Sequence, residues 1–249
     1  MGSEMCIRDS IGKSLEHSFS KGFFTSFFKE NGILAEYHNL EVADGKFLEE
    51  VIGDNSYSGF NVTIPYKESV IPFLDELSQE AKNINAVNTV HVIGGKRVGH
   101  NTDAQGFHQS VKPFLRNIHE RAIILGDGGA AKAVKYVLQN LGIDVISVVR
   151  DKKSAEQFTF DEVNDYMMRV CKFVVNTTPV GTFPNIDDVL PIPLDQFGVD
   201  HLVVDLVYNP TRTVLLKKAE ERGSAVLNGE SMLYAQALKS WEIWSGHDK

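Results

Sequence analysis

The chain has 249 residues, enough for two domains of about 100 to 150 residues each. Its formal net charge is −8, with 43% hydrophobic and 23% charged residues and no block of like charges. This composition is typical of a globular protein. It argues against a nucleic-acid partner or an anionic membrane surface and favours a small-molecule ligand.

The sequence lacks the features of membrane, secreted or metal-binding proteins. No apolar run approaches the roughly 18 residues that a membrane helix needs, and the N-terminal leader MGSEMCIRDS lacks the apolar core of a secretory signal. Cys6 and Cys171 lie far apart, and the histidines form no HxH or HExxH pattern. We therefore expect a cytoplasmic protein without a membrane partner, a nucleic-acid partner or a bound metal.

In the first part of the chain, short apolar runs alternate with helical patterns, which predicts an α/β domain. Strands are predicted over residues 35–42 and 59–64, AEYHNLEV and GFNVTI. Helices are predicted over residues 23–32 and 43–53, and each ends in glycine. The segment that follows predicts a β-hairpin with its turn at Gly94–Gly95.

The second part of the chain has the pattern of a doubly wound parallel sheet. Its strands are predicted from five apolar runs separated by helical stretches: 121–125, 144–149, 172–176, 201–206 and 225–228. We expect the boundary between the two domains to lie between Asn101 and Gly106. The helical pattern of residues 229–244 suits either domain, so this pattern alone does not assign the last helix.

The clearest motif is ILGDGGAAKAV, in which Gly126, Gly128 and Ala131 form G-x-G-x-x-A between a predicted strand and a predicted helix. The glycines permit a tight turn and close approach of a pyrophosphate, and the helix N-terminus supplies N–H groups for the anion. An ordinary tight turn is the alternative. Because strand, loop and helix follow in the expected order, we predict a dinucleotide site.

The next predicted strand ends in Arg150, where an acidic residue would bind the ribose 2′-hydroxyl of NAD. Arginine instead suits a 2′-phosphate. Lys152 and Lys153 add positive charge, whereas Asp151 reduces it, and a solvated charged loop would also account for the lysines. We predict NADP rather than NAD as the cofactor.

Seven segments, in order from about Ile11 to the end of the chain, resemble the successive signatures of the shikimate dehydrogenase family. They are SLEHSFS (14–20), NVTIPYK (61–67), NAVNTV (85–90), NTDAQGF (101–107), GDGGAA (126–131), NTTPVG (176–181) and NGESMLYAQA (228–237). No single segment is decisive, but seven in register make the resemblance specific.

The resemblance implies an α/β enzyme of two domains with a cleft between them. Residues 1–103, completed by a C-terminal helix in 230–249, would form a substrate-binding domain with a mostly parallel sheet. Residues 104–229 would form a Rossmann-like NADP-binding domain. The implied reaction is the reversible, NADPH-dependent reduction of 3-dehydroshikimate to shikimate in the pathway to chorismate and the aromatic amino acids.

The resemblance also implies roles for individual residues. The catalytic pair would be Lys67 and Asp103. The substrate would be bound by Ser18, Ser20, Asn61, Thr63, Asn88 and Gln236. The nucleotide loop would be Gly126, Gly128, Gly129, Ala130 and Ala131, with Arg150 and Lys153 beside it on the charge argument given above. The nicotinamide side of the cofactor would be contacted by Thr177, Thr178, Val207, Tyr208 and Gly229.

These residue types fit the implied chemistry. Shikimate presents a carboxylate and three ring hydroxyls, which Ser, Asn, Thr and Gln can satisfy without adding a buried charge. Asn61 and Thr63 are two residues apart in a predicted strand and are expected on the same face. Lys67 can donate a proton to the alkoxide that hydride transfer generates, while Asp103 holds its ammonium group.

Other roles and functions are compatible with the same residues. Lys67 can be a solvated lysine, while Ser18, Ser20 or Asp103 can be a helix N-cap. The alternative functions are a quinate/shikimate dehydrogenase that prefers NAD and a catalytically silent nucleotide-binding regulator. The sequence leaves a monomer and a homodimer open.

Three features depart from the family pattern. Lys21 stands where the family commonly has proline, and Asp127 stands where it commonly has alanine, which places a negative charge near the presumed pyrophosphate. The N-terminal leader replaces an apolar first strand, and Glu4, Arg8 and Asp9 would be costly to bury in a sheet covered on both faces. We expect a non-native leader that forms no well-packed central strand.

Overall fold

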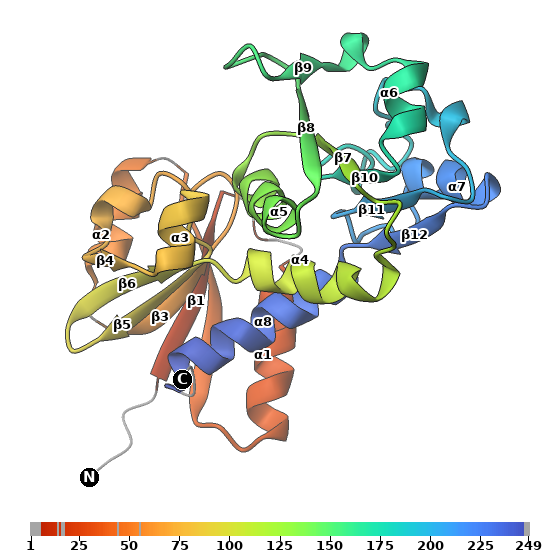
Figure 1. The fold of residues 1–249 in the computed structure, drawn as a ribbon. Helices are drawn as coiled ribbons and strands as arrows, with labels where there is room; N and C mark the ends of the chain where they lie inside the picture. Colours follow the sequence, from red (N-terminus) through yellow and green to blue (C-terminus); the bar gives the residue numbers. More distant parts are fainter. Residues whose placement is uncertain (1–5, 14, 16–17, 44, 55, 247–249) are drawn as a thin grey trace. The chain divides into compact units, whose positions relative to one another are not determined.

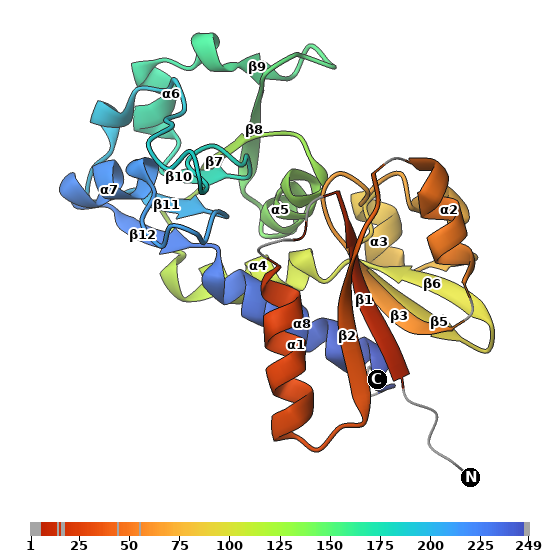
Figure 2. The ribbon, with the colours of Figure 1, turned by 180° about the vertical axis from the view of Figure 1, so that it is seen from behind.

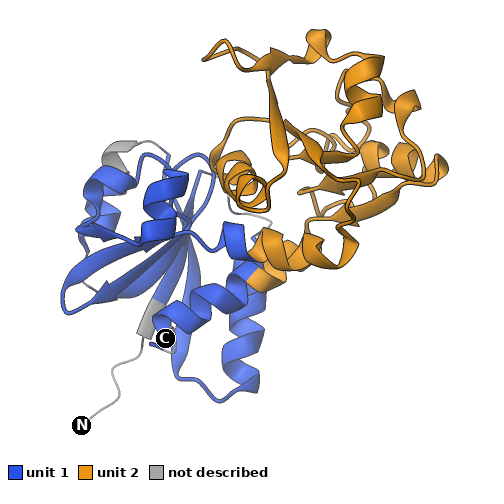
Figure 3. Cartoon of the chain, viewed as in Figure 1, with its two compact units in different colours: residues 1–105, 236–249 blue, residues 106–235 orange. Residues whose placement is uncertain are grey.

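The computed structural model describes residues 6–13, 15, 18–43, 45–54 and 56–246. Figures 1 and 2 show the ribbon from two sides, and Figure 3 shows its two compact units. One unit contains the described residues up to Gln105 together with those from Gln236 onward, and the other is Gly106–Ala235. Each unit contains one six-stranded sheet with helices, which confirms the α/β class.

The sheet of the first unit has the strand order β2-β1-β3-β5-β6-β4. Its strands are β1 (Cys6–Gly12), β2 (Ala35–Glu41), β3 (Tyr57–Val62), β4 (Glu76–Leu77), β5 (Thr89–Ile93) and β6 (Lys96–His100). β1 is parallel to β2 and β3, β4 is parallel to β6, and β5 is antiparallel to β3 and β6. The predicted hairpin is confirmed, with Gly94 and Gly95 at φ values of 58° and 77°.

Helices cover both faces of this sheet. On one face, α1 (Phe19–Glu30) and the end of α8 (Glu230–Trp244) lie side by side in Figures 1 and 2 and share a core cluster with β2. On the other face, α2 (Gly45–Gly53), α3 (Gln79–Ile84) and the short helix η1 (Ile71–Phe73) pack against β1 and β3. Alternate residues of β1 and β3 therefore face different helices.

β1 contradicts the prediction that the N-terminal leader forms no packed central strand. Arg8 and Asp9 are only 5% and 3% exposed, and β1 lies between β2 and β3. The Arg8 guanidinium lies over the rings of Trp241 and Trp244, 5.3 Å and 5.4 Å from their centroids. Cation–π contacts of this kind offset part of the cost of burying the charge. Glu4 lies outside the described residues.

The second unit contains a parallel sheet of strand order β12-β11-β10-β7-β8-β9. Its strands are β7 (Arg121–Leu125), β8 (Asp144–Val149), β9 (Phe158–Thr159), β10 (Phe173–Asn176), β11 (Leu202–Asp205) and β12 (Ala225–Asn228). The five predicted strands are confirmed, and β9 is an additional short edge strand. The strand order reverses between β7 and β10, and such switch points are where doubly wound sheets bind ligands.

Helices also cover the second sheet. α5 (Gly129–Asn140) connects β7 to β8 and packs on them. α6 (Asp165–Val170) and α7 (Val214–Glu221) share one core cluster with the sheet. The connections β7-α5-β8 and β11-α7-β12 run in opposite directions across the sheet, so right-handed crossovers place α5 and α7 on opposite faces. The remaining helices are α4 (Asp103–Val111), η2 (Lys112–Phe114), η3 (Phe160–Glu162) and η4 (Leu194–Gln196).

Candidate active site

Lys67 and Asp103 form a largely buried ion pair in the first unit. The Lys67 Nζ lies 2.6 Å from the Asp103 Oδ2, and the two side chains are 13% and 7% exposed. Lys67 follows β3 in a turn, and Asp103 is the first residue of α4, where the helix dipole favours a carboxylate. The Asn101 Oδ1 accepts the N–H of Ala104 at 3.2 Å. Asn101 therefore caps the first turn of α4, and the Asp103 carboxylate is turned toward Lys67.

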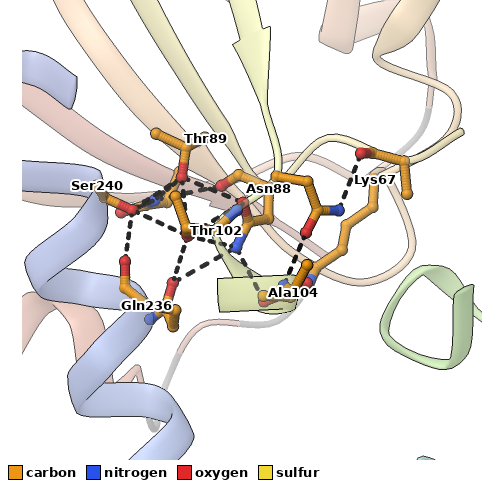
Figure 4. A network of polar contacts seen from close by, with 11 residues as sticks. Lys67, Asn88, Thr89, Thr102, Ala104, Gln236 and Ser240 are labelled. Atoms are coloured by element: carbon orange, nitrogen blue, oxygen red, sulfur yellow. Dashed lines mark hydrogen bonds and ion pairs between the residues drawn. The ribbon is translucent and has the colours of Figure 1, made fainter. Parts of the chain in front are cut away.

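Asn88 joins this pair to a network of neutral polar side chains (Figure 4). The Asn88 Nδ2 donates to the Asp103 Oδ1 and the Thr102 Oγ1, each at 2.9 Å, and lies 3.5 Å from the Gln236 Oε1. The Asn88 Oδ1 accepts the backbone N–H of Thr102 at 2.7 Å. Each Asp103 carboxylate oxygen thus has a donor, Lys67 on one and Asn88 on the other.

Asn61 extends the network along β3. The Asn61 Oδ1 accepts the hydroxyl of Tyr37 at 2.8 Å, and its Nδ2 lies 3.1 Å from both the Thr89 Oγ1 and the Ser240 Oγ. The Tyr37 hydroxyl also lies 2.8 Å from the Ser10 Oγ and close to the side chain of Ser20, and burial raises the pKa of Tyr37. Tyr37 is therefore a neutral donor that fixes the orientation of the Asn61 amide.

Two residues of the predicted substrate set stand apart from this network. Ser18 is the N-cap of α1, and its hydroxyl accepts the N–H of Lys21 at 3.3 Å. Thr63 lies one residue beyond the end of β3, and its hydroxyl makes no hydrogen bond to any residue that the structure describes. Both hydroxyls are thus still able to bind a ligand, since a hydroxyl that caps a helix keeps its proton to donate.

Five polar residues of the network were not predicted from the sequence: Ser10, Tyr37, Thr89, Thr102 and Ser240. Ser240 lies four residues after Gln236 in α8, and this helical spacing was a usable signal. Thr89 and Thr102 adjoin the predicted Asn88 and Asp103 in sequence. No local pattern identifies Tyr37, because its contact with Asn61 depends on strand order.

The loop between β7 and α5 has the form of a nucleotide cradle. Gly126 has φ of +114°, and a Cβ there would lie 2.6 Å from the Thr177 Oγ1. Gly128 is the N-cap of α5, whose first N–H groups have no partner within the helix. The Thr177 Oγ1 donates to the carbonyl of Leu125 at 2.7 Å, so the ends of β7 and β10 are joined at the switch point. These features fit a dinucleotide pyrophosphate.

The basic residues after β8 differ in their partners. The Lys153 Nζ lies 2.5 Å from the Asp127 Oδ2, and the Lys152 Nζ lies 2.6 Å from the Glu162 Oε1. Arg150 is exposed and forms no ion pair within the described part of the chain. Asp127, the unusual acidic residue of the glycine loop, is therefore neutralised by one of the two basic residues expected at the cofactor phosphate.

The residues predicted for the nicotinamide side lie at one edge of the second sheet. Thr177 and Thr178 follow β10, Val207 and Tyr208 follow β11, and Gly229 follows β12. In a parallel sheet these carboxyl ends lie at the edge that also carries the glycine loop. The backbone N–H of Gly229 donates to the Val207 carbonyl at 3.2 Å, which joins the last two loops.

The described residues contain neither a cluster of metal ligands nor a helix that could span a membrane. Within the described ranges, no group of three or more His, Cys, Asp or Glu side chains is arranged to hold a metal ion. None of the helices described has both the length and the apolar character that a membrane span requires.

A glycine loop at the switch point of a parallel sheet binds dinucleotides, and a lysine–carboxylate pair can exchange a proton with an alcohol or ketone. These two features place the protein in the class of nucleotide-dependent alcohol oxidoreductases. The family model of the shikimate dehydrogenase substrate binding domain matches residues 10–90. The shikimate dehydrogenase (NADP+) of Caldicellulosiruptor saccharolyticus is 37% identical over 252 residues, which cover 94% of this chain and 90% of that relative. The chain belongs to the shikimate dehydrogenase family.

Solved structures extend this similarity over both units. A shikimate dehydrogenase from Aquifex aeolicus is 33% identical with a TM-score of 0.88, covering 99% of this chain and 94% of that one. The enzyme from Thermus thermophilus, solved in complex with NADP(H) and shikimate, is 30% identical with a TM-score of 0.84 and covers 97% and 94%. The resemblance inferred from seven segments is confirmed.

Proposed function

We propose that this chain catalyses the reversible reduction of 3-dehydroshikimate to shikimate with NADPH, with Lys67 and Asp103 as its catalytic pair. The observation that carries the proposal is the 2.6 Å ion pair set in a network of neutral polar side chains. The name of the Caldicellulosiruptor relative and the ligands of the Thermus structure support the substrate and the cofactor. This reaction belongs to the biosynthesis of chorismate and the aromatic amino acids.

The neutral network suits the substrate. Asn61, Asn88 and Gln236 are buried, and the hydrogen bonds described above hold each amide in one orientation. The Asn61 Oδ1 accepts one hydrogen bond and keeps a second lone pair for a ring hydroxyl. The Nδ2 hydrogens of Asn61 and Asn88 already have acceptors, which substrate groups would replace. Because these side chains are already ordered, binding costs little side-chain entropy. We assign Ser18, Ser20 and Thr63 to the same substrate set.

The proton transfer follows from the Lys67–Asp103 pair. NADPH, when bound, supplies the hydride that adds to the ketone carbon. Lys67 donates a proton from its Nζ to the ketone oxygen, so a hydroxyl forms rather than an alkoxide. Asp103 accepts a remaining Lys67 N–H and keeps the amine directed, while Asn88 orients the carboxylate from its other side. Lys67 is partly exposed and regains its proton from water. Alcohol oxidation uses the same residues in reverse.

Cofactor binding is assigned to the second unit. Gly126, Gly128, Gly129, Ala130 and Ala131 would hold the pyrophosphate at the start of α5, and Arg150 and Lys153 would bind the 2′-phosphate. The nicotinamide side is assigned to Thr177, Thr178, Val207, Tyr208 and Gly229. We accordingly propose residues 104–229 as the cofactor domain and residues 1–103, with 230–249, as the substrate domain. A cytoplasmic location and a monomeric or homodimeric state stay predictions.

A double-mutant cycle on the catalytic pair tests this proposal. Removing a positioned general acid costs on the order of 10²–10⁴ in rate, so Lys67→Ala should lower kcat by about that factor while KM for shikimate changes far less. Adding Asp103→Asn should cost much less in the Lys67→Ala enzyme than in the wild type, because the two residues act as a unit.

Steady-state kinetics of the four proteins, with shikimate and NADP, measure these losses in kcat. Lys82→Ala, at an exposed position of α3, is the matched control. Near-normal kcat for Lys67→Ala, or additive losses, would refute the assignment.

A further inference from the structure

Asp205 is a fully buried carboxylate at the end of β11 that the reaction above does not use. The Asp205 Oδ1 accepts the backbone N–H of Val207 at 3.0 Å and the Nδ2 of Asn176 at 2.9 Å. The Asp205 Oδ2 accepts the hydroxyl of Thr213 at 2.6 Å. Both oxygens are thus bonded, to three different segments of the second unit.

These bonds join two loops at the carboxyl edge of the sheet. The Asn176 Oδ1 accepts both the N–H and the hydroxyl of Thr178, at 2.9 Å and 2.7 Å. One continuous chain of hydrogen bonds therefore runs from Thr178 through Asn176 and Asp205 to Val207. It ties the loop after β10 to the loop after β11, and Thr213 ties both to the start of α7.

The loop after β12 packs closely against the loop after β11. A Cβ at Gly229 would collide with the carbonyl oxygen of Leu206, which lies between Asp205 and Val207. The Gly229 N–H also donates to the Val207 carbonyl. The backbone around Val207 is therefore fixed by Asp205 on one side and by the start of α8 on the other.

Stability alone does not explain a carboxylate at this position. Burial raises the pKa of Asp205 to about 6, although three hydrogen bonds oppose the rise. At neutral pH the side chain is ionised, and its charge is less stable in the folded than in the unfolded protein. Asp205 joins the loops after β10 and β11, on the ligand side of the sheet, at a cost in stability. This arrangement indicates a role in the cofactor site.

We propose that Asp205 is a positioning residue that holds the Thr178 and Val207 loops in place for the nicotinamide half of NADP. The proposal rests on the assignment of these loops to that half under the proposed function. Asp205 acts through its neighbours and does not touch the cofactor. The adenosine half, bound by the glycine loop and Arg150, lies outside its influence.

Dissection of the cofactor into fragments tests this proposal. Dissociation constants are measured by calorimetry for NADPH and for adenosine 2′,5′-bisphosphate, which lacks the nicotinamide half. Asp205→Ala should weaken NADPH binding on the order of tenfold, because loosened loops misplace their contacts, and should leave the bisphosphate constant unchanged. Asp205→Asn should restore NADPH binding, because its Oδ1 can accept the same two bonds and its Nδ2 can face Thr213.

The matched control lies at the opposite end of the same strand. His201 directly precedes β11 and is also buried with two polar contacts, to the Gly198 N–H at 3.1 Å and the Met168 carbonyl at 2.8 Å. His201→Ala should leave both dissociation constants unchanged. Equal NADPH losses in His201→Ala and Asp205→Ala, equal losses of both ligands in Asp205→Ala, or an Asp205→Asn protein as weak as Asp205→Ala would overturn the proposal.

Two further measurements keep the test decisive. If Asp205→Ala does not fold, Thr213→Val removes one of the three bonds and should show the same selective loss of NADPH affinity, to a smaller degree; an unchanged NADPH constant would then overturn the proposal. A wild-type protein that fails to bind adenosine 2′,5′-bisphosphate would contradict the nucleotide site itself, and thus the proposed function rather than the role of Asp205.

Discussion

Asp127 and Lys153 show how one acidic residue changes the charge of a nucleotide loop. Their side chains are 39% and 74% exposed and lie 2.5 Å apart. Exposed ion pairs contribute only about 0–1 kcal/mol, so a phosphate can compete with Asp127 for the lysine. Arg150 has no such competitor among the described residues, and we expect it to make the main contribution to recognition of the 2′-phosphate.

Replacement of Arg150 tests cofactor selectivity. Arg150→Ala should raise KM for NADP by about tenfold or more, the loss expected for a charge-assisted hydrogen bond, and should change KM for NAD little. Kinetics with both cofactors measure the difference. Lys152→Ala, whose ammonium is held by Glu162, is the control. Equal effects on NADP and NAD would show that Arg150 does not bind the phosphate.

Replacement of Asp127 should have the opposite effect. Asp127→Asn removes a negative charge beside the pyrophosphate and releases Lys153, so the dissociation constant of NADP should fall by about two- to fivefold, the scale of an exposed ion pair. The gain should shrink when Lys153→Ala is already present. Calorimetric titration of the four proteins measures both effects, and unchanged or weaker binding by Asp127→Asn would count against them.

At the scale of the secondary-structure element, β1 is the strand with the most unusual composition. It carries Arg8 and Asp9 into the middle of the sheet, where Arg8 contacts the rings of Trp241 and Trp244. A buried guanidinium loses its hydration, and aromatic contacts return only part of that free energy. β1 is therefore formed, but at a cost in stability.

A single substitution in β1 tests this cost. Arg8→Leu should raise the free energy of unfolding by about 1–3 kcal/mol, as replacing buried charges with apolar groups of similar volume does elsewhere. Urea denaturation measures it. Arg222→Leu, at an exposed ion pair with Asp195, should give no such gain. A less stable Arg8→Leu protein would mean that the guanidinium contacts outweigh the lost hydration.

Elements that depend on short segments of sequence could be predicted, whereas those that depend on contacts between distant residues could not. Apolar runs and glycine turns are short-range signals, so five of the six strands of the second sheet and the hairpin at Gly94–Gly95 were predicted correctly. β1 was not, because its burial depends on Trp241 and Trp244 at the far end of the chain. Lys67 and Asp103 were found through family resemblance, whereas Tyr37 depends on a contact between strands that no local pattern encodes.

At the scale of the whole molecule, buried titratable groups couple stability to pH in opposite directions. Burial lowers the pKa of His119 and His201 below the usual value of 6.5, so these side chains favour the folded state above pH 6.5 and lose that contribution as the pH falls through their folded pKa. Asp205 behaves oppositely. Its contribution is complete below pH 3.8 and is lost as the pH rises through about 6.

The raised pKa of Asp205 predicts a pH-dependent gain in stability when asparagine, its neutral isostere, replaces it. At pH 7.5, Asp205→Asn should raise the free energy of unfolding by up to about 3 kcal/mol, the equivalent of a pKa raised from 3.8 to about 6. The gain should shrink as the pH falls toward 4, where wild-type Asp205 is itself protonated in the folded state. Urea titrations of both proteins at a series of pH values measure it, and a difference that is constant with pH would contradict it.

The division of the chain into units has a consequence for the order of synthesis. Residues 106–235 are continuous, so that unit can fold as soon as it leaves the ribosome, as domains generally do during translation. The unit with Lys67 must wait for residues 236–246, because Ser240 completes the hydrogen bonds of Asn61 and Trp244 donates to the Val90 carbonyl on β5. Until then, the part of this sheet that α8 covers, beside α1, stays exposed and open to chaperones.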